Sequence, residues 1–484
     1  MKPKKRRIRF SQTNILRLKW MYCYICGEEV KVAGETYNVR CGTCTAMLTY
    51  DDHEILKEKK PRVVGISGTS HTRYKSFQMA RDAKLYDRDT FVLYGGSHAT
   101  FTAADTLDNV PEIDVVVKGE GEQSTLQVVE KALKGKYDFD DIEGISFRKD
   151  EKIVHNRPIT RMQSLEALPF PKRNPQDFKK YNLKMDFINV PGASIMTSRG
   201  CPLNCSYCSA SFMFGKTLTF RSAKNVVDEI EMLLSDFGVK GIKFFDSTLT
   251  LKKSHIEALC EEIKKRRLRF PWECEIRVNT VDKELLRKMK DAGCYYVDFG
   301  LESASDRVLK EMHKGIRLEH VENVIRWTND LGILTKVFFT YGHIKETIED
   351  ARMTMEFVKK YKKNITLPVE IIGIRTYPGT LVEKYAREIG NLSDDFSWVK
   401  PYYDKEAEFL TGFPGIPLLI QPQMGYKELK TLKLELLGRK IRDPRRLIKA
   451  LYNAWNKNNI KKVYTTAKGY VKSKTLELLS ASEK

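Results

Sequence analysis

The chain has 484 residues and a formal charge of +21, from 84 Lys and Arg against 63 Asp and Glu. A hydrophobic content of 42% excludes a disordered composition, and no apolar run approaches the roughly 20 residues that span a bilayer. The N-terminus also lacks the apolar stretch of a secretory signal. We therefore expect about three globular domains in a cytoplasmic protein.

Residues 1–20 form a basic arm, and residues 21–55 carry two C-x-x-C pairs. The pairs are Cys23 with Cys26 and Cys41 with Cys44. In a reducing compartment this spacing is typical of a tetrahedral four-cysteine metal site rather than of disulfides. We expect structural zinc, as in a zinc ribbon, with a rubredoxin-like iron as the alternative.

Residues 60–160 alternate short apolar runs with amphipathic stretches. The runs "RVVGIS", "TFVLYGG" and "DVVVKGEGE" predict strands, and residues 142–158 predict a β-hairpin. This pattern indicates a Rossmann-like α/β domain. The segment 158–190 is rich in proline and lysine, so we expect it to connect this domain to the next.

Residues 190–385 contain six strand-like runs that alternate with amphipathic stretches, from "SIMTSRG" to "VEIIGIRTY". Such alternation predicts a parallel sheet with helical crossovers, and six units indicate a partial (β/α)6 barrel rather than a complete one. Chemistry is expected at the carboxyl ends of its strands.

Residues 386–484 are expected to be mainly helical and basic, with fifteen Lys or Arg against three Asp or Glu between 427 and 474. The interleaved Tyr and Trp suit an anionic membrane surface, where the protein would be peripheral, or RNA. A solvated helical face explains the same composition equally well.

The stretch "SRGCPLNCSYCSAS" places Cys201, Cys205 and Cys208 just after the first strand of the predicted barrel. Thiolates are suited to iron–sulfur clusters, and three of them leave one iron of a [4Fe–4S] cluster without a protein ligand. That iron could bind a substrate or cofactor. An incomplete zinc site, with its fourth ligand from elsewhere, is the alternative.

This motif, with Tyr207 before the last cysteine, resembles the signature of the radical S-adenosylmethionine (SAM) superfamily. The resemblance implies that the open iron binds the amino and carboxylate groups of SAM. Reductive cleavage would then release a 5′-deoxyadenosyl radical that abstracts hydrogen from an unactivated carbon. It also implies a partial (β/α)6 barrel and a reductant such as ferredoxin or flavodoxin.

Other strand ends resemble the SAM-contacting segments of that superfamily. The residues that the resemblance assigns to SAM are Asp246, Ser247, Thr248, Arg277, Glu302, Ser303, Glu346 and Thr347. Where relatives commonly have Gly-Pro-Gly-Glu-Thr after the fifth strand, this chain has His343, Ile344 and Lys345 before Glu346 and Thr347. Each of these residues could instead be an ordinary helix cap.

The 60–160 segment resembles the second half of the cobalamin-binding (B12-binding) domain that precedes many radical SAM enzymes. The first strand–helix pair and the Asp-x-His-x-x-Gly loop of that domain are missing. His71 and His98 remain, but neither stands in such a loop. A truncated domain that only braces the barrel explains the pattern as well as cobalamin binding does.

The resemblance implies C-methylation, ring formation or C–C coupling on a lipid or natural product. One alternative is an RNA-modifying, methylthiotransferase-like enzyme. Such enzymes hold a second cluster in their N-terminal domain, and residues 62–190 contain no cysteine. The other alternative is a non-catalytic, zinc-ribbon nucleic-acid-binding protein.

Overall fold

The computed structural model describes residues 56–173, 178 and 183–441, together with four short strands near the N-terminus. These strands form two antiparallel pairs: β1 (Met21–Tyr22) with β2 (Glu29–Val30), and β3 (Asn38–Arg40) with β4 (Met47–Thr49). None of the described helices is long and apolar enough to cross a membrane.

Several predictions made above fall on other parts of the chain. The basic arm, the cysteines of the expected four-cysteine site at positions 23, 26, 41 and 44, and the basic tail after residue 441 lie outside the described residues. The metal of the four-cysteine site and the anionic partner therefore stay predictions.

The first α/β unit has a five-stranded sheet in the order β5-β6-β7-β8-β9. Its strands are β5 (Val63–Ser67), β6 (Phe91–Gly95), β7 (Val115–Val117), β8 (Ile145–Lys149) and β9 (Lys152–His155). The first three are parallel, and the last two form the predicted antiparallel hairpin. The helices are α2 (Arg73–Tyr86), α3 (Ser97–Phe101), α4 (Ala103–Asn109) and α5 (Glu122–Leu133).

The second unit is a six-stranded parallel sheet in the order β10-β13-β14-β15-β16-β17. Its strands are β10 (Gly192–Ile195), β13 (Gly241–Phe244), β14 (Trp272–Glu275), β15 (Cys294–Glu302), β16 (Leu334–Tyr341) and β17 (Leu367–Ile372). Chain order equals spatial order, so each strand lies beside the next one in sequence. This is the predicted open (β/α)6 arrangement, and the mixed α/β fold class is confirmed.

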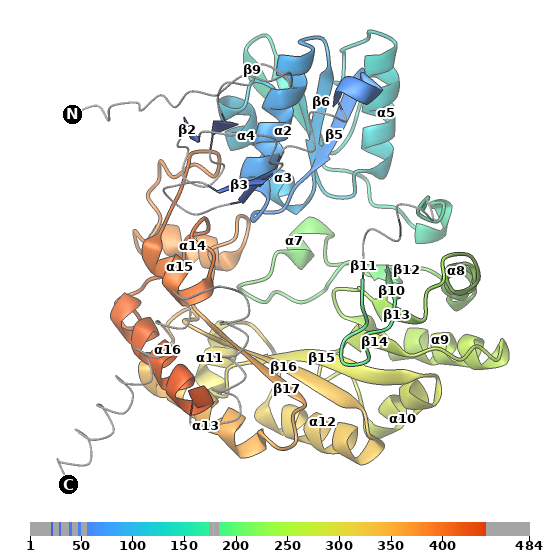
Figure 1. The fold of residues 1–484 in the computed structure, drawn as a ribbon, viewed down its shortest axis with the longest axis vertical. Helices are drawn as coiled ribbons and strands as arrows, with labels where there is room; N and C mark the ends of the chain where they lie inside the picture. The colour runs from blue at the N-terminus through green and yellow to red at the C-terminus, as the bar shows by residue number, and fades with distance from the viewer. Residues whose placement is uncertain are drawn as a thin grey trace.

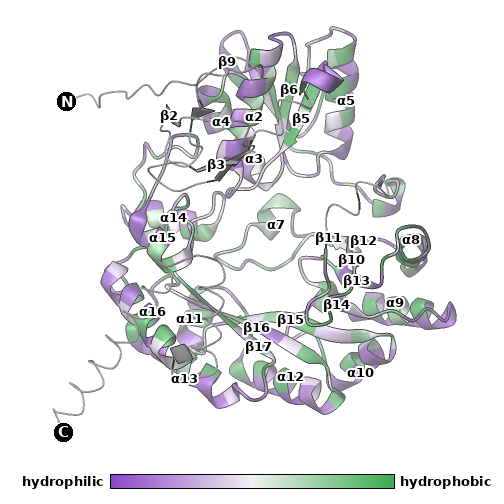
Figure 2. Ribbon diagram, viewed as in Figure 1, coloured by the Kyte–Doolittle hydropathy of each residue, from purple (hydrophilic) through white to green (hydrophobic). Residues whose placement is uncertain are grey.

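Helices cover the outside of this open barrel (Figure 1). They are α8 (Ala223–Asp236), α9 (Lys253–Lys265), α10 (Lys283–Asp291), α11 (Asp306–Glu311), α12 (Leu318–Leu331) and α13 (Ile348–Tyr361). A further helix, α14 (Leu381–Glu388), lies between the first sheet and the barrel. Figure 2 shows both hydrophobic and hydrophilic residues along α8, α9 and α10, as expected of helices with one buried face. The buried face joins a core with Trp272, Cys274, Cys294 and Val297, which are the outward side chains of β14 and β15.

Local capping fixes where several of these helices begin. The side chains of Ser222, Asp282, Thr347 and Thr380 accept a hydrogen bond from a backbone N–H of the first turn of α8, α10, α13 and α14. Because each helix follows a strand end closely, these caps set the length of the loops at the carboxyl edge of the sheet.

The chain after the barrel returns to the first unit. It contains α15 (Lys405–Thr411) and α16 (Tyr426–Ile441), and Figure 1 shows the 380–411 region between the first sheet and the barrel. The buried Arg73 of α2 holds this returning chain, since its guanidinium donates to the carbonyls of Trp398 (2.9 Å) and Gly415 (2.5 Å). The two units are therefore joined by buried hydrogen bonds between residues more than 300 positions apart.

Candidate functional site

The three cysteines lie on one loop at the carboxyl edge of the barrel. The loop is closed at its base by the antiparallel pair β11 (Ser198–Arg199) and β12 (Thr219–Phe220). Gly200, at the start of the loop, has a φ of +101°, and a Cβ there would collide with the carbonyl oxygen of Thr217. Only glycine fits this position, so the backbone requires the glycine of the sequence "RGC".

Cys201 and Cys205 are buried, and Cys208 is half-buried. Burial raises the pKa of the Cys201 and Cys208 thiols, and the nearby cations Arg277 and Lys314 act in the opposite direction for Cys201. Cys201 and Cys208 are therefore protonated when free, so binding of a metal cluster releases protons. Three thiolates are soft ligands suited to an iron–sulfur cluster. The two nearby cations would offset the negative charge of such a cluster.

An ionic network lies directly under the cysteine loop. Tyr207, inside the motif, donates to Glu302 Oε1 (3.1 Å) and accepts from Lys314 Nζ (2.6 Å). Lys314 Nζ also donates to Glu302 Oε1 (3.2 Å), and Thr340 donates to Glu302 Oε2 (2.9 Å). The network therefore ties the loop to the ends of β15 and β16.

Glu302 is the centre of this network and has a positive φ of +69°. Burial alone would raise the pKa of its carboxyl, but the Lys314 ammonium and the hydrogen bonds hold that pKa below its usual value. His343 packs against the Tyr207 ring (5.6 Å between centroids), and burial lowers its pKa to about 4. His343 is thus neutral at physiological pH.

The carboxylate of Asp246 is engaged within the protein. It is buried, and its carboxylate accepts from the backbone N–H and hydroxyl groups of Thr197 and Ser198, at 2.5 to 3.2 Å. Burial raises its pKa to about 6 despite these bonds. Asp246 therefore anchors the chain that leads into the cysteine loop, and the neighbouring Ser247 is exposed and Thr248 half-exposed at the edge of the barrel.

Of the remaining predicted residues, Arg277 lies beside the cysteine loop, and Ser303 lies in the barrel wall. Arg277 is buried beside the site and donates to Asn279 Oδ1 (2.8 Å) and to the carbonyl of Lys314. Ser303 is fully buried against Thr354 of α13, away from Glu302.

Glu346 and Thr347 organise the turn after β16. Glu346 Oε2 accepts from the N–H groups of Gly342 and His343, and Thr347 caps α13. Burial raises the pKa of Glu346 to about 8. The structure thus brings Arg277 and Glu302 to the cysteine loop and gives Asp246, Ser303, Glu346 and Thr347 partners in the wall.

Sequence reasoning missed Lys314, whose ammonium donates to both Tyr207 and Glu302. It lies in the loop between α11 and α12, where no strand end or spacing pattern marks it. The signal that was present is Gly315, whose φ of +63° permits the turn beside it.

The carboxyl edge of the first sheet faces the cysteine loop. Arg199, two residues before Cys201, forms ion pairs with Glu120 (3.2 Å) and Glu122 (2.5 Å), which follow β7. Figure 1 shows α7 (Ala210–Met213), which continues the cysteine loop, between this sheet and the barrel. A group bound between the two units would therefore touch both.

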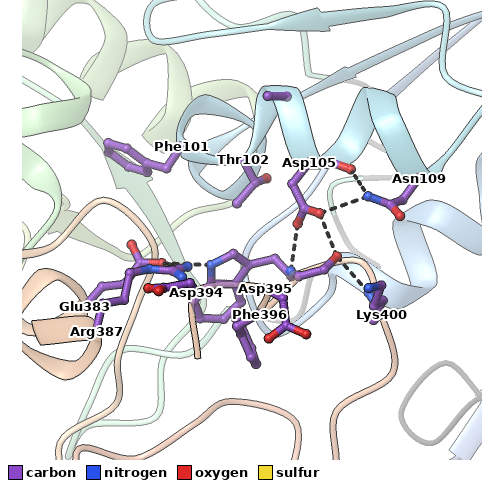
Figure 3. A pocket seen from close by; sticks show the side chains of 13 residues that line it. Phe101, Thr102, Asp105, Asn109, Glu383, Arg387, Asp394, Asp395, Phe396 and Lys400 are labelled. Carbon is purple, nitrogen blue, oxygen red and sulfur yellow. Dashed lines mark hydrogen bonds and ion pairs between the residues drawn. The ribbon is translucent and has the colours of Figure 1, made fainter. Parts of the chain in front are cut away.

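One cavity lies away from the cysteine loop. It has a volume of about 390 Å³ and lies between α4 and the returning chain, lined by residues such as Asp105, Glu383 and Trp398 (Figure 3). Asp105 accepts from Ser397 Oγ (2.6 Å) and from the Trp398 N–H (2.7 Å). These bonds join the first unit to the returning chain, and we call this contact the seam. We assign the cavity to the seam and not to the active site.

Within the described ranges, no group of three or more His, Cys, Asp or Glu is arranged to hold a single metal ion. This result does not bear on a [4Fe–4S] cluster, because each thiolate of such a cluster binds a different iron atom.

Comparison with known proteins decides the family. The radical SAM superfamily model matches residues 195–358, and the B12 binding domain model matches residues 48–129. An uncharacterized methyltransferase of Pyrococcus horikoshii is 35% identical over 355 residues, which are 73% of this chain and 75% of that protein. The chain belongs to the radical SAM superfamily. As a radical SAM enzyme it uses a [4Fe–4S] cluster and SAM, and it needs an electron donor.

Two other relatives of this radical SAM enzyme have more specific names. The anaerobic magnesium-protoporphyrin IX monomethyl ester cyclase of Rubrivivax gelatinosus is 29% identical over 71% of this chain and 62% of that protein. The hopanoid C-3 methylase of Methylococcus capsulatus is 27% identical over 62% of this chain and 56% of that protein. The chain spans less than two thirds of the length of both.

Solved structures share the fold of this radical SAM enzyme. The methyltransferase TsrM from Kitasatospora setae, with cobalamin and a [4Fe–4S] cluster bound, matches with a TM-score of 0.64 at 20% identity, over 79% of this chain and 81% of that chain. The cobalamin-dependent enzyme OxsB matches with a TM-score of 0.56 at 18% identity, over 79% of this chain and 54% of that one. Both likenesses show that the fold is shared.

Proposed function

We propose that this enzyme binds its cluster through Cys201, Cys205 and Cys208, binds SAM beside them, and methylates an unactivated carbon. The observation that carries the proposal is the cysteine loop, held by Tyr207 over the Glu302–Lys314 pair. When bound, the cluster supplies the electron that cleaves SAM. Methyl transfer is favoured over ring formation because the relative with the highest identity given above is named a methyltransferase.

The residues of the chain divide the work of binding SAM. Ser247 and Thr248 lie at the open edge, where they can donate to a ligand, and Arg277 and Lys314 supply positive charge for its carboxylate. Glu302 orients Lys314 and Tyr207 rather than acting alone. Asp246, Ser303, Glu346 and Thr347 hold the loops in place, so we assign them positioning roles.

We infer that cobalamin binds between the two units. The match to the B12 binding domain and the facing of the first sheet toward the cysteine loop support this. His98, on α3, has a buried Nε2 without a hydrogen-bond partner, and its ring is enclosed by Phe77 and Trp398. The loops that would hold the cofactor follow β5, β6 and β7. His98 has no open path to it, so we expect cobalamin to bind without this histidine as a ligand.

The substrate and partners follow from the same comparisons. Relatives named for tetrapyrrole and hopanoid substrates favour a lipid or another apolar natural product. An RNA substrate is not favoured. We further propose ferredoxin or flavodoxin as the electron donor, a cytoplasmic location, and an anionic surface as the contact of the basic termini.

The experiment is anaerobic reconstitution followed by incubation with SAM and dithionite. We expect 5′-deoxyadenosine from the wild type and none from the Cys201→Ala, Cys205→Ala and Cys208→Ala variants. Bound corrinoid is quantified on the same preparations. A wild-type sample with four irons and no 5′-deoxyadenosine overturns the proposed function, and a corrinoid-free sample that refuses added cobalamin overturns the cofactor assignment.

A further inference from the structure

The interior of the barrel contains a carboxyl pair that the proposed chemistry does not use. Glu275 of β14 lies opposite Asp298 of β15 in the strand register. Their neighbours Cys274 and Val297 belong to the outer core. Because successive side chains of a strand point to opposite faces, Glu275 and Asp298 both face the lumen.

Nothing in the described part of the chain satisfies this pair fully. Asp298 is 4% exposed, and its Oδ1 has no hydrogen-bond partner. Its nearest cation is Lys336, with Nζ 3.8 Å from Oδ2. Tyr296, two residues before it on the same face, is fully buried and has an unpartnered hydroxyl. The Tyr296 ring packs against Phe187 of the connector, 5.0 Å between centroids. The unpartnered Oδ1 of Asp298 is therefore the acceptor that a donor from a ligand could satisfy.

The two lysines nearest the pair form ion pairs with other carboxylates. Lys243 lies 2.9 Å from Glu273, and Lys336 lies 3.4 Å from Asp186, a residue of the 158–190 connector. A third lysine, Lys314, is paired with Glu302, and its charge also reaches Glu275. Asp186 and Glu273 take the closer contacts of Lys336 and Lys243, which leaves Glu275 and Asp298 less well compensated.

The electrostatics agree with an unmatched pair. Burial raises the pKa of Asp298 to about 7, and burial also raises the pKa of Glu275. Glu275 is the exposed residue at the carboxyl end of β14. Bringing a positive charge between the two groups would remove this penalty.

One large aromatic side chain is exposed near the pair. Phe245 follows β13 and is 59% exposed. Because Phe244 belongs to the outer core, the alternation of the strand places Lys243 and Phe245 on the lumen side. A large exposed aromatic ring at the mouth of a site is suited to an apolar ligand body. An exposed aromatic ring thus lies close to the Glu275–Asp298 pair.

We propose that the barrel lumen binds a substrate with an apolar body and a basic nitrogen, and that Glu275 and Asp298 hold the nitrogen. This rests on the proposed function, since it names the substrate class for the same active site. The hydrogen bonds would be charge-assisted, from a protonated amine to the carboxylates. Phe245 would contact the apolar part.

The test uses the reconstituted holoenzyme under anaerobic conditions and three probes of equal chain length: hexylamine, hexan-1-ol and hexanoate. Calorimetric titration should show hexylamine binding to the wild type about tenfold or more tighter than either other probe. Glu275→Gln and Asp298→Asn should each remove this preference, while Glu284→Gln, on the outer face of α10, should keep it.

Two results would overturn the inference: hexylamine binds the wild type no better than hexan-1-ol, or both lumen variants keep the full preference. The comparison of probes on the wild type stands even where a variant fails to fold. Formation of 5′-deoxyadenosine is measured on the same samples. A wild type that binds hexylamine but makes no 5′-deoxyadenosine contradicts the proposed function and leaves the inference standing, and the reverse pattern contradicts the inference alone.

Discussion

At the residue scale, Lys314 is the cation that compensates Glu302 under the cysteine loop. Both side chains are about nine-tenths buried, at 10% and 9% exposure. Removing one partner of a buried ion pair leaves the other uncompensated and costs about 3 kcal/mol. We predict that Lys314→Met lowers the free energy of unfolding of the apoprotein by about this amount in urea titrations.

The matched control is Lys345→Met. Lys345 pairs with Glu311 at the same 3.2 Å, but at the surface, with 55% and 34% exposure. Surface pairs contribute roughly 0 to 1 kcal/mol. Equal losses in the two variants would show that the Lys314–Glu302 pair has no special part in stability.

Glu346 gives a second prediction at this scale. Burial raises its folded-state pKa from about 4.5 to about 8. The folded protein therefore binds this proton more tightly, so the stability that Glu346 contributes is complete below pH 4.5 and is lost as the pH rises to 8. Glu346→Gln should lose less stability between about pH 5 and about pH 8 than the wild type, by about 1 kcal/mol or more. Urea titrations at the two pH values measure this.

Glu349→Gln, on the exposed first turn of α13, is the control and should follow the wild type. If Glu346→Gln shows the wild-type slope with pH, the carboxyl of Glu346 is ionised in the folded protein and our assignment is wrong.

Residue types and spacing marked the three cysteines and Glu302 as candidates for one site, and the structure brings Glu302 to the cysteine loop through Tyr207. They could not predict that Asp246 turns into the wall, since that depends on the hydroxyl and N–H groups of Thr197 and Ser198, which lie 49 and 48 positions away. Lys314 had no local signal of its own beyond the glycine that follows it.

At the scale of the element, the cysteine loop depends on Gly200. Alanine there would combine a disfavoured positive φ with a clash against Thr217. We predict that Gly200→Ala lowers the iron bound per chain by more than half after reconstitution, because the loop cannot close with its thiols in place. Iron and sulfide analysis tests this.

Gly238→Ala separates strain from collision. Gly238 also has a positive φ, of +65°, but a Cβ there meets nothing within 4 Å. This variant should lose only the strain energy of about 1 kcal/mol and load iron as the wild type does. Full iron loading in Gly200→Ala would contradict our account of the loop.

Alternation of apolar runs predicted both sheets and the hairpin of β8 and β9, because strands and amphipathic helices carry their period in the local sequence. The connector gave no such signal. Its Asp186 pairs with Lys336 inside the barrel, 150 positions away, and only the closed fold brings them together.

At the scale of the molecule, Arg73 joins the first unit to the returning chain. The residue is 1% exposed, and its guanidinium bonds to carbonyls rather than to an acid. We predict that Arg73→Met speeds hydrogen exchange of residues 396–415 roughly tenfold, about 1.4 kcal/mol of local opening. Exchange measured by mass spectrometry tests this.

Arg88→Met, at an exposed position after α2, should leave that exchange unchanged. Unchanged exchange in Arg73→Met as well would show that the seam is held by other contacts. The sequence could not predict this seam, since its partners are separated by most of the chain. The domain boundaries drawn from composition remain predictions.

The central claim is that the three cysteines leave one iron of the cluster open for SAM. The most direct measurement is electron–nuclear double resonance of the reduced cluster with SAM labelled by ¹⁵N at the amino group and ¹⁷O at the carboxylate. Our account predicts hyperfine coupling of both labels to the cluster, lost in Cys205→Ala. An intact four-iron cluster that shows no coupling to either label would contradict it.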